Sequence, residues 1–134
     1  MRKVVVEYKV VKQICEFPRL YRSGKNVPAI QLYEESAYEN LHTQISQSDF
    51  EAVLKRNPAI IESWVSFSED KRWSPAWGLK KLDEEHWNVY FVAKDGRLTY
   101  RIDYTSGVSA CALMIRMEME DFRLRKKQRT KLRR

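Results

Sequence analysis

Side chains that could bind a metal or act as a nucleophile are few in this sequence. The two histidines, His42 and His86, have no cysteine or histidine at the spacing of metal ligands, whereas a structural zinc site takes about four ligands and a catalytic one about three. No Gly-x-Ser-x-Gly motif is present, no glycine-rich loop precedes a predicted helix, and neither Cys15 nor Cys111 has a histidine near it in the sequence. We expect no metal and no cofactor. A catalytic group assembled only in the folded chain stays open.

Two clusters of carboxylates have the chemistry for acid–base catalysis. Residues 83–85 (DEE) stand before a predicted strand, and Glu118, Glu120 and Asp121 fall on the last predicted helix. Acid–base chemistry with paired carboxylates requires burial that separates their pKa values. We expect both clusters to be exposed instead, the first in a turn and the second on a solvated helix face.

A charged segment next to tryptophan is the main candidate for binding a protein. Its members are Glu69, Asp70, Lys71, Arg72 and Trp73. Tryptophan is a frequent anchor in protein interfaces, and charges around an anchor set the association rate and the specificity. We predict that Trp73 contacts a protein partner while Trp77, four positions later, points into the core. In the alternative interpretation, both rings close the core at the junction of a helix and a strand.

The positive charge of the chain is concentrated at its C-terminal end, residues 123–134, here called the basic tail. The formal net charge is +7, yet residues 1–122 carry 17 cations against 18 anions, because eight of the 25 Lys and Arg lie in the tail and no acid does. The eight are Arg123, Arg125, Lys126, Lys127, Arg129, Lys131, Arg133 and Arg134.

A tail of this composition is typical of sequence-independent binding to nucleic-acid phosphates through counterion release. Two other interpretations stay open. Cations stabilise the C-terminal end of a helix through its dipole, and a like-charged end keeps a chain disordered and soluble. In each case the tail has little apolar surface, so we predict that it is dispensable for folding.

The first third of the chain predicts strands. Residues 3–11 (KVVVEYKVV) are rich in valine, which favours a buried strand. Over residues 14–34 we expect extended segments around a turn at 23–26, because Pro18 and Pro28 disfavour a helix.

Helices are predicted in the middle of the chain. One covers residues 34–44, a second starts at a capping box formed by Ser48 and Glu51, and a third runs from Asn57-Pro58 to about Glu69.

The C-terminal half predicts three strands and a helix. The strands cover residues 76–82, 87–93 and 98–104, and Asp-Gly within 94–97 indicates a tight hairpin between the last two. An apolar ridge then predicts a helix over residues 108–125. The fold class is therefore α+β: a mainly antiparallel sheet with a C-terminal three-stranded meander, helices packed on one face, and the basic tail.

Size and composition indicate one domain, residues 1–122, followed by the tail at 123–134. The 134 residues are 43% hydrophobic, with enough aromatic residues to fill a core. Two cysteines far apart in sequence indicate a reducing compartment rather than a disulfide scaffold. The N-terminal apolar run is interrupted at Glu7, and no stretch approaches about 18 apolar residues. We therefore expect a cytoplasmic protein that does not enter a membrane.

Four short motifs resemble one class of bacterial proteins. They are residues 64–79 (WVSFSEDKRWSPAWGL), 87–90 (WNVY), 94–97 (KDGR) and 109–112 (SACA). In these motifs the chain resembles immunity-type proteins encoded beside polymorphic or contact-dependent toxins, over residues 60–122. The resemblance implies an α+β fold, no catalytic residues, and a function in which the protein covers the active site of a toxin.

These observations leave three classes of function. We expect a non-enzymatic binding protein that neutralises or docks a specific protein partner, above all a bacterial toxin. The first alternative is a nucleic-acid-associated protein that uses the basic tail. The second is a small nuclease-like enzyme whose His, Glu, Arg and Tyr residues converge only in the fold.

Overall fold

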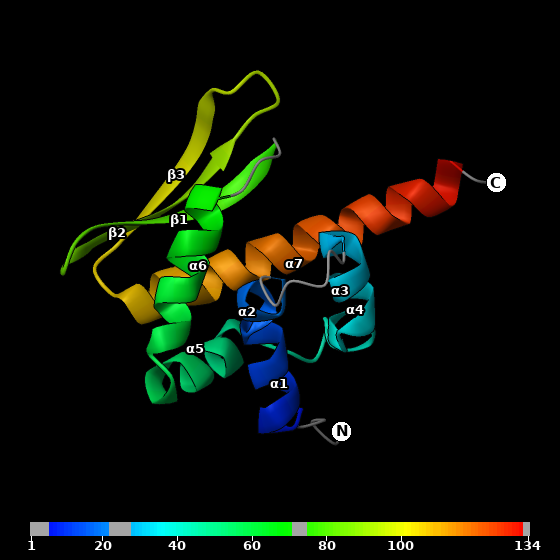
Figure 1. The fold of residues 1–134 in the computed structure, drawn as a ribbon, viewed down its shortest axis with the longest axis horizontal. Helices are drawn as coiled ribbons and strands as arrows, with labels where there is room; N and C mark the ends of the chain where they lie inside the picture. The colour runs from blue at the N-terminus through cyan, green and yellow to red at the C-terminus, as the bar shows by residue number, and fades with distance from the viewer. Residues whose placement is uncertain (1–5, 22–27, 71–74, 133–134) are drawn as a thin grey trace.

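The computed structural model of the chain describes residues 6–21, 28–70 and 75–132, without the side chains of 129–132. In these residues there are seven helices and three strands, so the α+β class is confirmed (Figure 1). Their order is α1 (Tyr8–Cys15), α2 (Phe17–Tyr21), α3 (Ala29–Glu35), α4 (Tyr38–Leu41), α5 (Gln47–Arg56), α6 (Ala59–Asp70), β1 (Ala76–Asp83), β2 (His86–Val92), β3 (Leu98–Tyr104) and α7 (Gly107–Leu132).

The described part of the first third is helical, so the prediction of strands there was wrong. Helix α1 occupies much of the valine-rich segment, and its buried residues are Val11, Ile14 and Cys15. Their i, i+3, i+4 spacing forms one face of a helix. The β-branched side chain of valine lowers helix propensity only slightly. Burial of the apolar face stabilises the helix by more than that, so packing decides the conformation.

The two prolines that argued against helices stand where helices accept them. Pro18 is the second residue of α2, and Pro28 is the N-cap of α3. In the first turn of a helix the N–H that proline lacks has no intrahelical partner, so its absence costs little.

The predicted helix over residues 34–44 is two helices. Helix α3 ends at Glu35 and α4 begins at Tyr38, because Ser36 takes an extended conformation and its hydroxyl donates to the carbonyl of Tyr33 at 2.6 Å. The capping box of α5 also differs from the prediction. It is formed by Ser46 and Asp49, two residues earlier than expected.

The three strands form an antiparallel sheet in the order β1-β2-β3. Their bounds agree with the predicted strands to within one or two residues. The predicted hairpin between β2 and β3 is also present, and Gly96 in its turn has a φ of +85°, a conformation that glycine adopts without strain.

Helix α7 crosses one face of the sheet and contacts all three strands. On that face Leu79, Trp87 and Val89 are buried. At its start α7 passes so close to the sheet that a Cβ atom on Gly107 would lie 2.6 Å from the ring of Trp87. Helix α6 packs along β1, where the hydroxyl of Ser68 accepts a hydrogen bond of 2.9 Å from the backbone N–H of Leu79.

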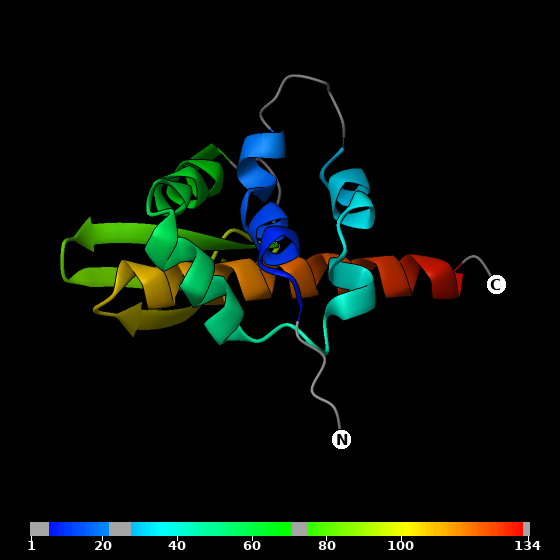
Figure 2. The same ribbon diagram turned by 90° about the horizontal axis from the view of Figure 1, so that it is seen from below.

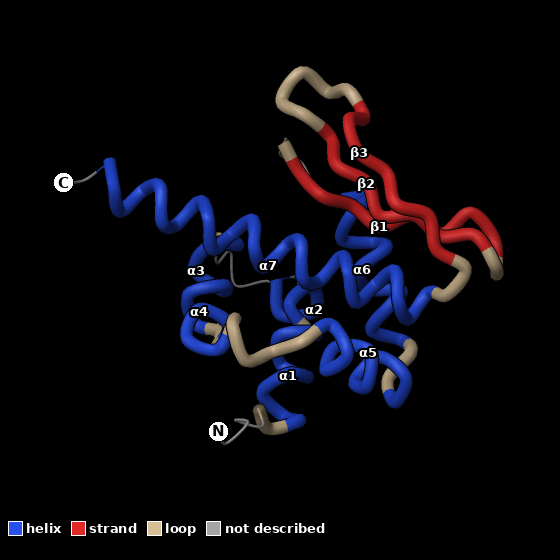
Figure 3. The backbone as a smooth tube through the Cα atoms, turned by 180° about the vertical axis from the view of Figure 1, so that it is seen from behind, coloured by secondary structure: helices blue, strands red, loops and turns tan. Residues whose placement is uncertain are grey.

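The rest of the molecule is arranged along α7, which continues as helix to Leu132 rather than ending near residue 125 as predicted. Figures 1 and 2 show the sheet near its N-terminal end and α3 and α4 towards its C-terminal end. Figure 3 shows α1, α4 and α5 on the side of α7 opposite the strands. None of the described helices is long and apolar enough to cross a membrane.

The fully buried tryptophan of the core is Trp64 of α6, not Trp77. Its indole N–H donates to the carbonyl of Cys15 at 2.8 Å, and its ring stacks on Phe17. Both cysteines are buried and free, as the small hydrophobic side chains of a core would be. Trp77 is only half-buried, at the margin of the core.

Candidate protein-binding surface

The predicted binding segment 69–73 is described only in part. Glu69 and Asp70 end α6 and are exposed; Lys71, Arg72 and Trp73 lie outside the described residues. Glu69 lies close enough to Tyr90 of β2 for its charge, added to the effect of burial, to raise the pKa of that tyrosine. The segment therefore begins at one end of the sheet, and the role of Trp73 stays a prediction.

At the same end of the sheet, three aromatic side chains stand in one row across the strands. Trp77 of β1 is opposite Phe91 of β2, which is opposite Tyr100 of β3. The ring centroid of Trp77 lies 5.1 Å from that of Phe91 and 5.9 Å from that of Tyr100. We call these three residues the aromatic row. Tyr100 is 56% exposed. Leu98 is 57% exposed, but the register shift between Phe91 and Val92 pairs it with Val92, so Leu98 does not continue the face of the row.

The position of α7 explains why the row is exposed. Nearer the start of α7, the neighbouring rows contain Trp87 and Val89, which are buried. In Figure 1 the end of the sheet that carries the β2–β3 turn projects away from α7. Ile102 is half-buried, whereas Tyr100 is exposed, so cover on this face decreases along β3 towards its turn. The aromatic row is therefore the point where the core opens to solvent.

The start of β1 is bound to α7 by Arg125. Its guanidinium donates to the carbonyl of Pro75 at 2.7 Å and pairs with Asp121 at 3.0 Å. A second tail cation, Arg123, pairs with Glu120. These first residues of the basic tail thus contact the body of the protein.

The remaining tail cations are described unevenly. Lys126 is half-buried and Lys127 is exposed. Arg129 and Lys131 belong to α7 but their side chains are not described, and Arg133 and Arg134 lie outside the described residues.

One of the two carboxylate clusters is not exposed as predicted. Glu118 is 1% exposed, and Glu120 and Asp121 are half-buried. The sequence pattern of α7 did not indicate this, because the helix is covered on several sides by other elements. The other cluster, residues 83–85, is exposed as expected. There the hydrogen bond from His86 lowers the pKa of Asp83.

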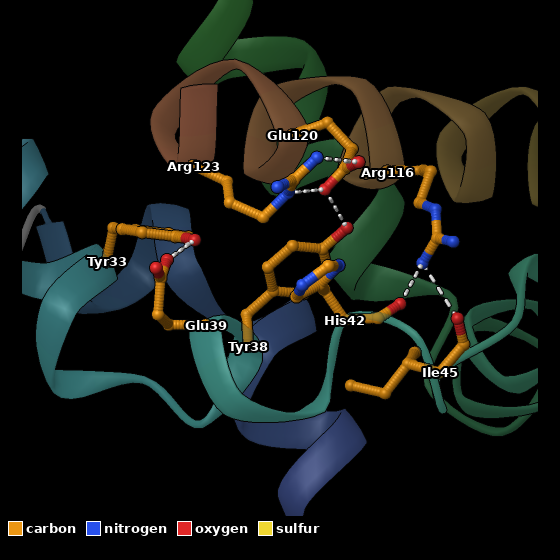
Figure 4. A network of polar contacts seen from close by, with 8 residues as sticks. All are labelled: Tyr33, Tyr38, Glu39, His42, Ile45, Arg116, Glu120 and Arg123. Carbon is orange, nitrogen blue, oxygen red and sulfur yellow. Dashed lines mark hydrogen bonds and ion pairs between the residues drawn. The ribbon is translucent and has the colours of Figure 1, made fainter. Parts of the chain in front are cut away.

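A polar network joins α3 and α4 to α7 (Figure 4). The hydroxyl of Tyr38 donates to Glu120 at 2.9 Å, and Arg123 donates to both oxygens of the same carboxylate at 2.8 and 3.1 Å. The hydroxyl of Tyr33 donates to Glu39. Burial followed by these hydrogen bonds raises the pKa of both tyrosines. Burial alone would also raise the pKa of Glu120, but its hydrogen bonds from Arg123 and Tyr38 outweigh that effect and lower it.

A further arginine of α7 completes the network. Arg116 donates to the carbonyl oxygens of His42 and Ile45 at 3.3 and 2.7 Å, which fixes the chain after α4. The ring of His42 lies against that of Tyr38, with centroids 6.2 Å apart. These residues come from positions 33 to 123, and their spacing in the sequence gave no signal of the network.

His, Glu, Arg and Tyr do converge in this network, as the nuclease-like alternative required. Their surroundings, however, are those of a structural joint. Tyr33 and Tyr38 are fully buried, while the guanidinium groups bind backbone carbonyls or Glu120. In the described part of the chain no three His, Cys, Asp or Glu side chains gather as a metal site would need.

No protein-family model, curated protein or solved structure matches this chain. Any indication of function therefore comes from the surfaces of the molecule itself. Of these, the aromatic row has the residue types and the exposure that a binding site needs.

Proposed function

We propose that this chain is a non-enzymatic binding protein that docks a specific protein partner through the aromatic row and the segment 69–73. The observation that carries the proposal is the exposed aromatic end of the sheet. Tyrosine and tryptophan dominate the binding energy of protein interfaces, and exposed apolar side chains that adjoin one another mark interaction sites. Tyr100 is exposed there, and its ring adjoins the half-buried ring of Trp77, which adjoins that of Phe91.

The charges that the segment 69–73 brings to this end of the sheet favour a selective partner. Glu69 and Asp70 at the end of α6 are exposed, and Lys71 and Arg72 follow them in the sequence. Charges at the rim of an interface change the association rate and reject partners of the wrong charge more than they add affinity. An aromatic centre with a charged rim is the usual anatomy of a protein interface.

The partner that we propose is a bacterial toxin, which the protein would neutralise by covering its active site. Support for this identity is the resemblance of residues 60–122 to immunity-type proteins. The first experiment is to express the product of the reading frame immediately upstream, with and without this chain. Growth arrest that co-expression relieves is the expected result. A harmless upstream product that fails to bind this chain in calorimetry would refute the toxin proposal.

The docking surface has a test of its own with the same partner. Tyr100→Ala should weaken binding by about 2 kcal/mol or more, about 30-fold in the dissociation constant. Leu82→Ala is the matched control, because Leu82 is 56% exposed at the opposite end of β1 from Trp77, and should leave binding unchanged. Equal affinities of both variants and the wild type would remove the aromatic row from the proposal.

A second candidate function, binding of nucleic acid through the basic tail, is favoured by one observation. Helix α7 continues to Leu132 and so holds tail cations on a regular helix. If all eight reach the phosphates of duplex DNA, the slope of log K against log salt approaches about −7. A slope near zero, or an affinity that survives deletion of residues 123–134, would exclude the tail as the binding site.

A further inference from the structure

The two edges of the sheet are protected differently. Helix α6 packs along β1, and Ser68 accepts a hydrogen bond from the β1 backbone at Leu79. Strand β3 contacts β2 and α7, and no strand of the described residues pairs with its outer edge. Residues 98–104 contain no proline or lysine, two residue types that blunt edge strands against pairing with other chains. The outer edge of β3 therefore offers backbone hydrogen-bonding groups to a further strand.

We infer that a second copy of this chain pairs with this edge, β3 against β3, around a two-fold axis at Ile102. A two-fold axis perpendicular to the sheet makes the strands antiparallel and places Ile102 opposite itself. Arg101 is then opposite Asp103 of the second copy, and this pair occurs twice because the interface is isologous. Tyr100 is opposite Tyr104 of the second copy. Opposite charges and aromatic pairs are both favourable across antiparallel strands.

The charges also select this register over its neighbours. Pairing must shift by two residues at a time, since a shift by one would turn the side chains to the other face. A shift of two in one direction places Arg101 opposite Arg101 of the second copy. A shift in the other direction places Asp103 opposite Asp103. Like charges directly opposite each other destabilise a sheet, so the register centred on Ile102 is the favoured one.

The side chains available at this edge fit the inference. Arg101 and Asp103 are exposed, with 57% and 67% of their side chains accessible, and they stand on the face away from α7. On the other face Tyr100 is 56% exposed and gains cover from Tyr104 of the second copy. The inference does not depend on the proposed function, because the charged pairs that select the register lie on the opposite face of the sheet from the aromatic row; the two surfaces share Tyr100, at the edge of the row.

Sedimentation equilibrium of charge-reversal variants tests the inference. Pairing over residues 100–104 makes a small interface, so the wild type should be a dimer at about 100 μM protein and dissociate on dilution. Arg101→Asp alone and Asp103→Arg alone each set like charges opposite each other twice. Each should weaken the dimer at least about tenfold. In an equimolar mixture the acidic pair of one variant faces the basic pair of the other, and the dimer should return.

Arg101 and Asp103 also pair with each other within the same strand at 3.3 Å. The mixture distinguishes the loss of this internal pair from the loss of the pairs between two chains. Each variant in the mixture still lacks that internal pair. Arg97→Asp is the matched control, because Arg97 lies in the turn outside the paired stretch, and it should stay dimeric. A wild type that is monomeric at about 100 μM overturns the inference. The inference is also overturned if either charge reversal leaves the dimer intact, or if the mixture of the two variants stays monomeric. Circular dichroism of each variant confirms that it is folded.

Discussion

Removing the hydroxyl group of Tyr38 is expected to loosen the joint between α4 and α7. This hydroxyl is buried and donates to the carboxylate of Glu120 at 2.9 Å. A hydrogen bond to a charged group contributes about 1.5–3 kcal/mol. The lower value applies here, because 27% of the Glu120 side chain is accessible and Arg123 still binds it in the variant. We therefore expect Tyr38→Phe to reduce the free energy of unfolding by about 1.5 kcal/mol.

For a chain of 134 residues, a loss of 1 kcal/mol lowers the melting temperature by about 3–5 °C, so the expected decrease for Tyr38→Phe is about 5–7 °C. The assay is a thermal melt at pH 7 followed by circular dichroism. Tyr100→Phe is the matched control, because its exposed hydroxyl has water available in both states, and it should change the melting temperature by less than about 1 °C. Adding Glu120→Gln completes a double-mutant cycle, whose coupling free energy should exceed about 0.5 kcal/mol.

The pH dependence of the same variant gives an independent check. The pKa of Glu120 is lowered in the folded protein from its usual value of 4.5. The stabilisation from its ionised form is thus fully present above that value and is lost as the pH falls through the lower, folded pKa. The difference between the wild type and Tyr38→Phe should shrink over that interval. An unchanged melting temperature at pH 7, or a difference that persists at pH 2, would refute the role of the network.

Three further predictions concern stability. The pKa values of Tyr33 and Tyr38 are raised in the folded protein, so folding stability is lost as the pH rises above about 10, where the tyrosines of the unfolded chain ionise. Urea titrations at pH 8 and pH 11 should show this loss, and equal midpoints would contradict it. Gly107→Ala should cost about 1–3 kcal/mol, because the buried ring of Trp87 cannot yield to the new methyl group; a melt within 1 °C of the wild type would contradict this. Ending the chain after Leu124 should lower the melting temperature by about 3–5 °C, chiefly because it removes the hydrogen bond from Arg125 to the carbonyl of Pro75. A decrease above about 8 °C would show that the tail packs more extensively.

The strands and helix α6 were predictable because their signals are local. Asp95-Gly96 specifies a tight turn, and the alternation of β3 follows from the pleat of a strand. Asn57-Pro58 marks the start of α6 in the same way. Each of these signals depends on a few neighbouring residues, and no distant contact competes with it.

The first third was not predictable by the same reasoning, because two local signals conflicted there. The β-branched residues of α1 favour a strand, whereas the i, i+3, i+4 spacing of Val11, Ile14 and Cys15 favours a helix. The conflict is resolved by tertiary packing, in which all three residues are buried in the core and Trp64 donates a hydrogen bond to the carbonyl of Cys15. The sequence of the segment alone contains no sign of that contact.

The candidate site was predictable only as a region. The sequence located it near residue 73, and the aromatic row begins at the half-buried Trp77, a few positions on. The other two residues of the aromatic row, Phe91 and Tyr100, join it through the register of the sheet. That register places Phe91 opposite Trp77 and Tyr100 opposite Phe91. A row across three strands has no signature in the linear sequence.

The length of α7 accounts for both the buried network and the exposed row. Its first turns cover the sheet at Trp87 and Val89. Its later turns carry Arg116, Glu120 and Arg123, which bind α4 and the chain that follows it. Helix α7 also holds the start of β1 through Arg125, but the end of the sheet with the β2–β3 turn projects away from the helix, so Tyr100 keeps its exposure (Figure 1). One helix thus both forms the joint and sets where the cover over the sheet ends.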